Sequence, residues 1–260
     1  MPARGAVPAG APIWNDLMTD DLDATVAFYS GLFGWTHEDH GEEYANYGTF
    51  SLDGKPVAGV MPRMSPEQPT VWTVHLHAPD ITAAVDAARG AGGTVLVDAL
   101  DVMDLGKQAV VVDPAGAAFS LWQPGTHDGF AVVAEHGAPG WHELHTQGFD
   151  TVLPFYDALG WTTHLMADEP QFRYAVDEVD DHQFAGIMDD PRSGIPGASY
   201  WLTYFGTDDA DATAARITEL GGTVVRGPED TPYGRLVNAK DPRGSEFSAI
   251  GPNIGEPQQG

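Results

Sequence analysis

Two acid/base side chains stand two positions apart in the stretch 141–146, which reads Trp-His-Glu-Leu-His-Thr. Side chains alternate between the two faces of a β-strand, so Glu143 and His145 share a face if this stretch is extended. A carboxylate beside an imidazole can take up and return protons, as in general acid–base catalysis. The same pair is also compatible with a structural role, in which the two groups only hydrogen-bond each other.

A second pair of titratable residues lies in an apolar stretch of the first half. His75 and His77 would again share one face of a strand. Two histidines and a carboxylate such as Asp16 are donors that a divalent metal ion accepts. Two hypotheses follow: proton transfer by His75 or by the Glu143–His145 pair, and a metal ion bound by His75, His77 and Asp16 or by that same pair.

The elements that position these residues occur twice. Trp14 recurs as Trp141, 127 positions later, and the Phe-Tyr pair at 28–29 recurs at 155–156 with the same offset. Both halves also contain Leu/Phe-Gly-Trp, Ala-Gly-Val/Ile-Met, Gly-Gly-Thr-Val and Asp-Pro-x-Gly. A period of this length is too long for a solenoid repeat, so the chain is a tandem duplication of a domain-sized unit.

The sequence of each half predicts two copies of a module with the order strand, helix and three strands. Strands are indicated by short stretches with alternating apolar residues, and hairpin turns by Asp53-Gly54 and by the Asp-Pro-x-Gly motifs. Helices are expected to begin at aspartate N-caps and to end at glycines. The N-cap candidates are Asp20 or Asp21, Asp80 and Asp209. We predict domains at 12–124 and 139–252, with flexible ends at 1–11 and 253–260.

The composition argues against several classes of function. The 260 residues include 38 Asp and Glu against 12 Lys and Arg, which gives a net charge of −26. Such a surface repels phosphate backbones and anionic lipids, so neither nucleic-acid nor membrane partners are expected. The absence of cysteine excludes disulfides, thiolate catalysis and thiolate metal sites. No stretch reads as a secretory signal or a membrane span, and a cytoplasmic protein is expected.

The duplicated motifs resemble those of the vicinal oxygen chelate superfamily, which includes glyoxalase I, extradiol dioxygenases, fosfomycin resistance proteins and bleomycin-binding proteins. The resemblance runs from about residue 12 to 250, and the Trp-x-Asp/Glu-Leu opening is similar to that of tandem glyoxalase-like proteins of actinobacteria. It implies an α+β fold of four βαβββ modules that form two glyoxalase-like open-barrel domains. Single-repeat members of the superfamily dimerise to make that assembly, so a monomer or a homodimer is expected.

In the superfamily's metal enzymes, the ligands stand near the start of a module's first strand and late in its last strand. In this chain those positions hold Trp14, Thr73 and Ser120 in the first half, and Trp141, Leu202 and Ser248 in the second. Tryptophan and leucine cannot bind a divalent ion, and serine is a poor ligand for one. The resemblance therefore implies that the usual metal site is absent, and neither a metal nor another cofactor is expected.

If these positions face the cavity, as in the superfamily, the alternation along each strand predicts the residues that line it. The first half supplies Trp14, Asp16, Thr73, His75, His77, Ser120 and Trp122, and the second supplies Trp141, Glu143, His145, Tyr204 and Ser248. The indoles of Trp14, Trp122 and Trp141 are suited either to stacking on a planar ligand or to filling the barrel. The superfamily pairs modules within a repeat or exchanges them, and both arrangements stay open.

The sequence thus predicts a metal-free cavity that binds a planar or aromatic small molecule, such as a drug or a secondary metabolite. The cavity would act by sequestration or by cofactor-free acid/base chemistry of the lyase or isomerase type. Glu143, His145 and His75 are the catalytic candidates. The alternative is a metal-dependent lyase or dioxygenase that binds a divalent ion through relocated ligands.

Overall fold

A computed structural model describes residues 7–190 and 199–254. The chain divides into two compact units, and each unit combines segments of both sequence repeats. Unit 1 comprises Met1–Trp14, Thr73–Gly129 and Trp141–Leu202, and unit 2 comprises Asn15–Trp72, Phe130–Gly140 and Thr203–Gly260. Each unit is therefore built from one module of each repeat.

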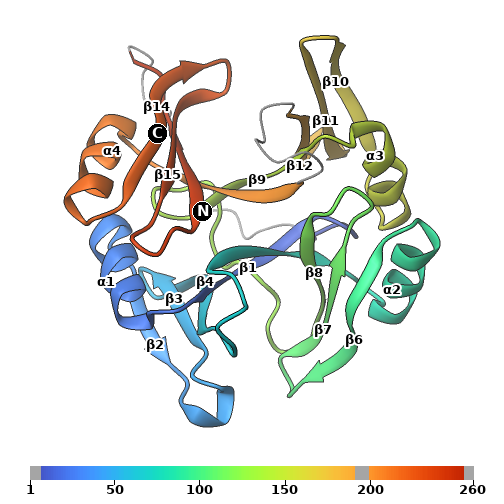
Figure 1. Cartoon of the computed structure of the whole chain (residues 1–260), viewed down its shortest axis with the longest axis horizontal. Helices are drawn as coiled ribbons and strands as arrows, with labels where there is room; N and C mark the ends of the chain where they lie inside the picture. The colour runs from blue at the N-terminus through green and yellow to red at the C-terminus, as the bar shows by residue number, and fades with distance from the viewer. Residues whose placement is uncertain (1–6, 191–198, 255–260) are drawn as a thin grey trace. The chain divides into compact units, whose positions relative to one another are not determined.

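Unit 1 is built around the second and third modules of the chain. The second module consists of β5 (Val71–His77), α2 (Ile81–Gly90), β6 (Thr94–Val102), β7 (Gly106–Val112) and β8 (Ala118–Pro124). The third consists of β9 (Pro139–Thr146), α3 (Phe149–Ala158), β10 (Thr163–Glu169), β11 (Phe172–Val179) and β12 (His182–Asp189). The first strand of each runs parallel to the last, with His75 opposite Ser120 and Glu143 opposite Gly186. Helices α2 and α3 pack against each other (Figure 1).

Unit 2 is built around the first and fourth modules. The first module consists of β1 (Pro12–Thr19), α1 (Leu22–Phe33), β2 (Thr36–Asp39), a 3-10 turn (Glu42–Tyr44), β3 (Gly48–Leu52) and β4 (Lys55–Pro62). The fourth consists of β13 (Tyr200–Gly206), α4 (Ala210–Glu219), β14 (Thr223–Thr231), β15 (Gly234–Lys240) and β16 (Glu246–Gly251). Here Asp16 lies opposite Gly59, and Tyr204 lies opposite Ser248, again in parallel pairs. Helices α1 and α4 pack against each other.

The strands form two eight-stranded mixed sheets, and neither sheet closes into a barrel. Strands β1–β8 belong to one sheet and β9–β16 to the other, so each sheet keeps to a single sequence repeat. The predicted α+β fold with four βαβββ modules is confirmed. Within residues 7–190 and 199–254, no helix is long and apolar enough to cross a membrane.

Three helices begin as the sequence predicts. The carboxylates of Asp21, Asp80 and Asp209 accept hydrogen bonds from backbone N–H groups in the first turns of α1, α2 and α4. These bonds satisfy donors that a helix start otherwise leaves without partners. Helix α1 ends at Gly34, whose φ of 72° is left-handed and favours glycine. Helix α3 differs, because it begins at Gly148 without a side-chain cap.

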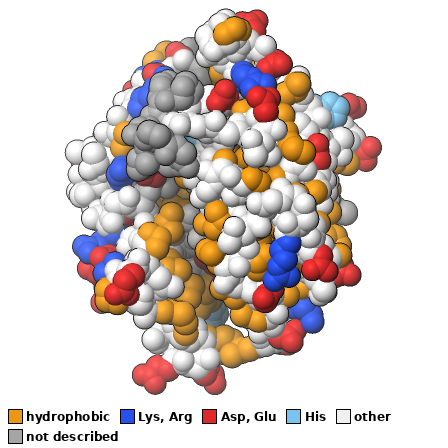
Figure 2. Space-filling view, turned by 45° about the vertical axis from the view of Figure 1, so that its right-hand side comes forward, with side chains coloured by type: hydrophobic (Ala, Val, Ile, Leu, Met, Phe, Trp, Pro, Cys, Tyr) orange, Lys and Arg blue, Asp and Glu red, His pale blue; other side chains and the backbone are white. Residues whose placement is uncertain are grey.

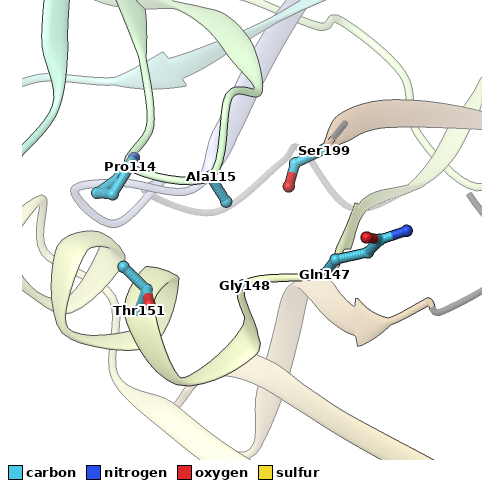
Figure 3. Close-up of a pocket in the computed structure, with 6 residues that line it drawn as sticks. All are labelled: Pro114, Ala115, Gln147, Gly148, Thr151 and Ser199. Carbon is cyan, nitrogen blue, oxygen red and sulfur yellow. The ribbon is translucent and has the colours of Figure 1, made fainter. Parts of the chain in front are cut away.

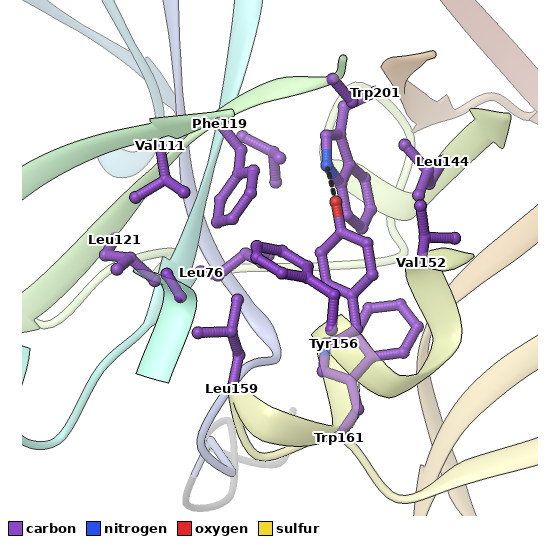
Figure 4. Packing of buried hydrophobic residues seen from close by; sticks show 14 of the residues in the cluster. Leu76, Val111, Phe119, Leu121, Leu144, Val152, Tyr156, Leu159, Trp161 and Trp201 are labelled. Carbon is purple, nitrogen blue, oxygen red and sulfur yellow. Dashed lines mark hydrogen bonds between the residues drawn. The ribbon is translucent and has the colours of Figure 1, made fainter. Parts of the chain in front are cut away.

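The core of unit 1 is organised around a buried tyrosine from the repeated Phe-Tyr motif. The Tyr156 hydroxyl donates to Asp113 Oδ2 at 3.0 Å. The same hydroxyl accepts from Trp201 Nε1 at 3.1 Å (Figure 4). Asp113 belongs to the first repeat, whereas Tyr156 and Trp201 belong to the second. The repeated motifs thus bring both halves of the sequence into one core.

The core of unit 2 contains the equivalent network. The Tyr29 hydroxyl donates to Asp241 Oδ2 at 3.3 Å and accepts from Trp72 Nε1 at 2.9 Å. Trp72 and Trp201 are both buried, which confirms the prediction that they are core residues. On the face of the molecule seen in Figure 2, acidic side chains stand at several separate places, some of them beside lysine or arginine. On this face the negative charge is dispersed.

Candidate acid/base site

Strand β9 places Glu143 and His145 on one face, as the alternation predicts. Both side chains are almost buried, with 8% and 6% of their residue surfaces exposed. Glu143 Oε1 lies 3.0 Å from His145 Nε2. No described residue places a hydrogen-bond acceptor in line with the Nε2–H bond of His145. The contact between Glu143 and His145 is therefore an ion pair and not an aligned hydrogen bond.

The other imidazole nitrogen is held by a second carboxylate. Asp190, which follows β12, places Oδ2 3.2 Å from His145 Nδ1. The Tyr200 ring stacks on the imidazole, with centroids 5.0 Å apart and an interplanar angle of 8°. Burial by itself lowers the pKa of His145, but the contacts and charges of Glu143 and then Asp190 outweigh it, so the pKa is raised. His145 therefore favours the charged imidazolium form.

Glu143 is also oriented by a tyrosine. The Tyr174 hydroxyl on β11 donates to Glu143 Oε2 at 2.7 Å and accepts from Trp141 Nε1 at 3.2 Å. The short O–H···O distance is typical of a hydrogen bond to an ionised carboxylate. We refer to Glu143, His145, Asp190 and Tyr174 as the acid/base cluster.

Three residues of this arrangement were not predicted from the sequence: Tyr174, Asp190 and Tyr200. Tyr174 carried a usable signal, because Tyr47 precedes it by the same 127 positions that separate Trp14 from Trp141. Asp190 and Tyr200 carried none, since each reaches His145 only through the pairing of distant strands. The structure therefore extends a predicted pair into a cluster with two carboxylates.

The candidates in the second module lie together on β5 and β8. His75, 2% exposed, is opposite Ser120, which accepts a hydrogen bond from Gln108, and its ring meets the Trp122 ring edge-on. Trp122 and Trp14 both pack against His127, a residue of the segment that joins the repeats. Both indoles are buried, and these contacts favour the barrel-filling interpretation over ligand stacking.

His77 and Thr73 occupy different surroundings. His77 Nδ1 lies 2.8 Å and 3.2 Å from the backbone carbonyl oxygens of Val7 and Pro8. This nitrogen therefore contacts the backbone at residues 7 and 8, which lie within the stretch 1–11 that the sequence predicts to be a flexible end. Thr73 is half-buried on β5.

The remaining candidates belong to unit 2. Asp16 Oδ1 accepts a hydrogen bond from the Tyr47 hydroxyl at 2.9 Å. Ser248 is fully buried, and its hydroxyl accepts from Asn238 Nδ2 at 2.7 Å. Tyr204 lies beside it in register and is 6% exposed. These residues form two polar contacts at positions that the sequence predicts to face the cavity.

The side chains present do not fit the metal site of the superfamily. Its ligand positions carry indole, aliphatic and hydroxyl side chains, and the two nitrogens of His145 each lie within 3.2 Å of a carboxylate oxygen. In the described part of the chain, no group of three His, Asp or Glu side chains is arranged to hold a metal ion. We therefore derive no step through a metal.

A shallow pocket of about 360 Å³ lies elsewhere in unit 1, where α3 begins (Figure 3). It is lined by Pro114, Ala115, Gln147, Gly148, Thr151 and Ser199. No member of the acid/base cluster lines it. These six residues carry no titratable side chain.

Comparisons with known proteins agree with this architecture. Residues 14–122 match the family described as "Glyoxalase-like domain", and residues 139–248 match the "Glyoxalase/Bleomycin resistance protein/Dioxygenase superfamily". The 2,3-dioxygenase LapB from Pseudomonas sp. KL28 has a similar structure, with a TM-score of 0.66, 14% identity, and coverage of 98% of this chain and 97% of that one. At this identity the likeness concerns the fold alone.

Two relatives are much closer in sequence. The protein CFP32 of Mycobacterium tuberculosis (strain CDC 1551 / Oshkosh), provisionally named a glyoxylase, is 38% identical over 100% of both chains. The anthracycline biosynthesis protein DnrV of Streptomyces peucetius is 38% identical over 93% of both chains. Two tandem domain matches and full-length identity at this level show that the chain belongs to the glyoxalase/bleomycin resistance protein/dioxygenase superfamily.

Proposed function

We propose that this protein binds a flat, hydroxylated aromatic molecule at the acid/base cluster, and that binding is its primary activity. The observation that carries the proposal is the His145 imidazole between the carboxylates of Glu143 and Asp190, at 3.0 Å and 3.2 Å. Burying two carboxylates and an imidazolium costs free energy, and such groups are concentrated at functional sites. The cluster therefore supports a role in recognition or proton transfer.

The surroundings of the cluster favour a planar ligand. Trp141 is half-buried and Tyr200 is half-buried, and both have rings next to the cluster's polar atoms. Aromatic rings beside a few fixed polar groups are typical of sites for small organic molecules. The relative DnrV is named for anthracycline biosynthesis, and anthracyclines are flat, fused-ring hydroxyquinones. This supports a secondary metabolite as the ligand.

The chemistry available to the cluster needs no cofactor. Glu143 can accept the proton of a ligand hydroxyl, and the imidazolium of His145 can donate its Nε2 proton to a ligand carbonyl oxygen. If both protons transfer, one O–H bond breaks and another forms, and the ligand tautomerises without gaining or losing electrons. Return of the proton from Glu143 to His145, whose nearest atoms are 3.0 Å apart, restores the cluster. Without transfer, the same contacts sequester the ligand.

A fluorescence titration tests the proposal with 1,4-dihydroxyanthraquinone as the probe. We expect the probe to quench tryptophan emission of the wild-type protein, and Glu143→Gln and His145→Gln to weaken binding about tenfold or more, as expected for a lost hydrogen bond to a charged group. His182→Gln is the matched control, because His182 is an exposed imidazole on the neighbouring β12. No quenching of the wild type, or equal affinity in all variants, contradicts the proposal.

A further inference from the structure

Unit 2 contains a counterpart of the acid/base cluster in which no histidine stands at the position equivalent to His145. Asp16 and Tyr47 precede Glu143 and Tyr174 by 127 positions each. The Tyr47 hydroxyl donates to Asp16 at 2.9 Å, as the Tyr174 hydroxyl donates to Glu143 at 2.7 Å. A tyrosine oriented on a carboxylate is therefore a feature of both repeats. We refer to Asp16 and Tyr47 as the first-repeat pair.

A glycine makes room for this contact in both repeats. Gly59 lies opposite Asp16 in the pairing of β1 with β4, and a Cβ there would overlap the Tyr47 hydroxyl and lie 2.5 Å from Tyr47 Cζ. Gly186 has the same relation to Glu143, and its Cβ would lie 2.7 Å from Tyr174 Cζ. Since real Cβ atoms do not approach other atoms this closely, both positions require glycine.

The two repeats differ in what surrounds the carboxylate. Met18 stands where the second repeat has His145, and Arg63 stands where it has Asp190. The backbone confirms the second equivalence, because Arg63 N donates to Thr19 O at 2.8 Å and Asp190 N donates to Thr146 O at 2.8 Å.

The Arg63 guanidinium is directed to other partners, the Asp20 carboxylate at 3.7 Å and the Gln68 carbonyl at 3.4 Å. The first-repeat pair therefore has a carboxylate and a phenol, and methionine stands at the position of the proton-carrying imidazole. Asp16 and Tyr47 are both half-buried, whereas Glu143 and Tyr174 are buried, so more of the first-repeat pair is exposed at the surface.

We infer that the first-repeat pair is a second binding site for the same class of flat, hydroxylated aromatic molecule, and that it binds without exchanging a proton. The inference rests on the proposed function of the acid/base cluster. Asp16 accepts the hydrogen bond of a ligand hydroxyl, and Tyr47 fixes the direction of the carboxylate. The duplicated chain then carries two sites, of which only the one in the second repeat can move a proton.

Equilibrium dialysis against 1,4-dihydroxyanthraquinone gives the number of molecules bound per chain. We expect two for the wild type. Gly59→Ala or Tyr47→Phe should abolish binding at the first-repeat pair and leave one molecule bound at the acid/base cluster. Gly186→Ala or Tyr174→Phe should abolish binding at the cluster and leave one molecule bound at the first-repeat pair. The two Tyr→Phe variants add no atoms to the core, so they retain the test if either alanine variant fails to fold, which circular dichroism shows.

The pH dependence separates the two sites. In Tyr174→Phe only the first-repeat site remains. His40 stacks on the Tyr47 ring with centroids 6.2 Å apart, but its Nε2 contacts the Thr49 hydroxyl at 2.9 Å, so the affinity should change less than about twofold between about pH 5.5 and pH 8. In Tyr47→Phe only the acid/base cluster remains, and its affinity should fall by about tenfold as the pH rises through the folded-state pKa of His145, because the imidazolium that donates to the ligand is then lost. One molecule per wild-type chain, lost in Tyr174→Phe and retained in Tyr47→Phe, overturns this inference but leaves the proposed function standing. No binding to the wild type overturns both.

Discussion

Gly186 occupies the position on β12 that lies directly opposite Glu143, and its missing side chain leaves the space that Tyr174 fills. The Tyr174 hydroxyl reaches Glu143 through this gap and donates a 2.7 Å hydrogen bond. The orientation of the carboxylate thus depends on a residue that contributes no functional group of its own.

Gly186→Ala should displace Tyr174 and weaken both stability and probe binding. A Cβ 2.7 Å from Tyr174 Cζ forces the ring to move, and overpacking of this kind costs about 1–3 kcal/mol of unfolding free energy. Gly90→Ala is the matched control. Gly90 ends α2, and a Cβ added there would meet no atom of the described residues within 4 Å, so stability should stay unchanged or rise by up to about 1 kcal/mol. Urea denaturation measures the stability of both variants, and the fluorescence titration measures their probe binding. Equal effects of the two changes would argue against the steric account.

The stability contribution of His145 should depend on pH. Its pKa in the folded protein is raised above 6.5, so the contribution is fully present below pH 6.5 and is lost as the pH rises through the folded-state value. The difference in unfolding free energy between the wild type and His145→Gln should therefore be largest at about pH 5.5 and decline toward about pH 9. Urea denaturation across this range measures it, and His182→Gln serves as the control. A difference that grows with pH would contradict the charged imidazolium.

The buried tyrosine networks should have matching energetic roles in the two units. Tyr156→Phe removes a donor to Asp113 and an acceptor for Trp201, and Tyr29→Phe removes the equivalent contacts with Asp241 and Trp72. Leaving buried polar groups without a partner costs about 1–3 kcal/mol, and each variant should lose that much unfolding free energy. Tyr233→Phe, at a tyrosine with 66% exposure, is the control and should change little. Loss in only one unit would show that the networks are not equivalent.

Asp177→Asn should stabilise the protein at neutral pH. Asp177 is fully buried on β11, its Oδ2 has no hydrogen-bond partner among residues 7–190 and 199–254, and burial is the main reason that its pKa is raised above 3.8. A carboxyl with a raised folded-state pKa contributes stability below pH 3.8 and loses it as the pH rises through the folded value. Asparagine keeps the acceptor for the Thr162 N–H without the charge, so the variant should gain about 1–2 kcal/mol at about pH 7. Asp181→Asn, at an exposed aspartate, is the control, and a less stable Asp177→Asn at neutral pH would contradict the prediction.

Chelator treatment should leave probe binding unchanged. Tryptophan, leucine, threonine and serine occupy the superfamily's ligand positions, and both nitrogens of His145 face carboxylates. Dialysis against EDTA followed by the fluorescence titration measures the effect, and addition of manganese or zinc checks for a weakly held ion. Elemental analysis of protein purified without affinity nickel provides the independent readout. Near-stoichiometric metal, or binding restored only by metal, would favour the alternative lyase or dioxygenase.

Local patterns in the sequence predicted most of the fold. The aspartate caps, the glycine at the end of α1 and the Asp53-Gly54 turn each depend on a few neighbouring residues, and the structure contains all of them. Strand β2 has no local signal of its own, because its four residues are polar and mostly exposed and show no alternation, so only the repeated order of elements predicts a strand there. Strong periodicity was present only where one face is buried.

The acid/base cluster could be predicted only in part. Glu143 and His145 are two positions apart, and strand alternation is enough to place them together. Asp190 reaches His145 because β12 runs parallel to β9, a long-range pairing that leaves no local pattern. The burial of the Asp177 carboxylate could not be predicted from the repeat. Asp177 stands where the first repeat has Phe50, a buried ring packed on Trp35, so comparison of the repeats indicates an apolar residue at this position.

Each compact unit draws its tyrosine network from both sequence repeats, and this makes the covalent join between the repeats a folding element. Asp113 meets Tyr156, and Tyr29 meets Asp241, between two halves that the segment 125–138 holds at a high effective concentration. Assembly of the cores is therefore unimolecular and independent of dilution. Divided at this segment, the same two polypeptides would have to find each other by collision, and their folding would become second-order.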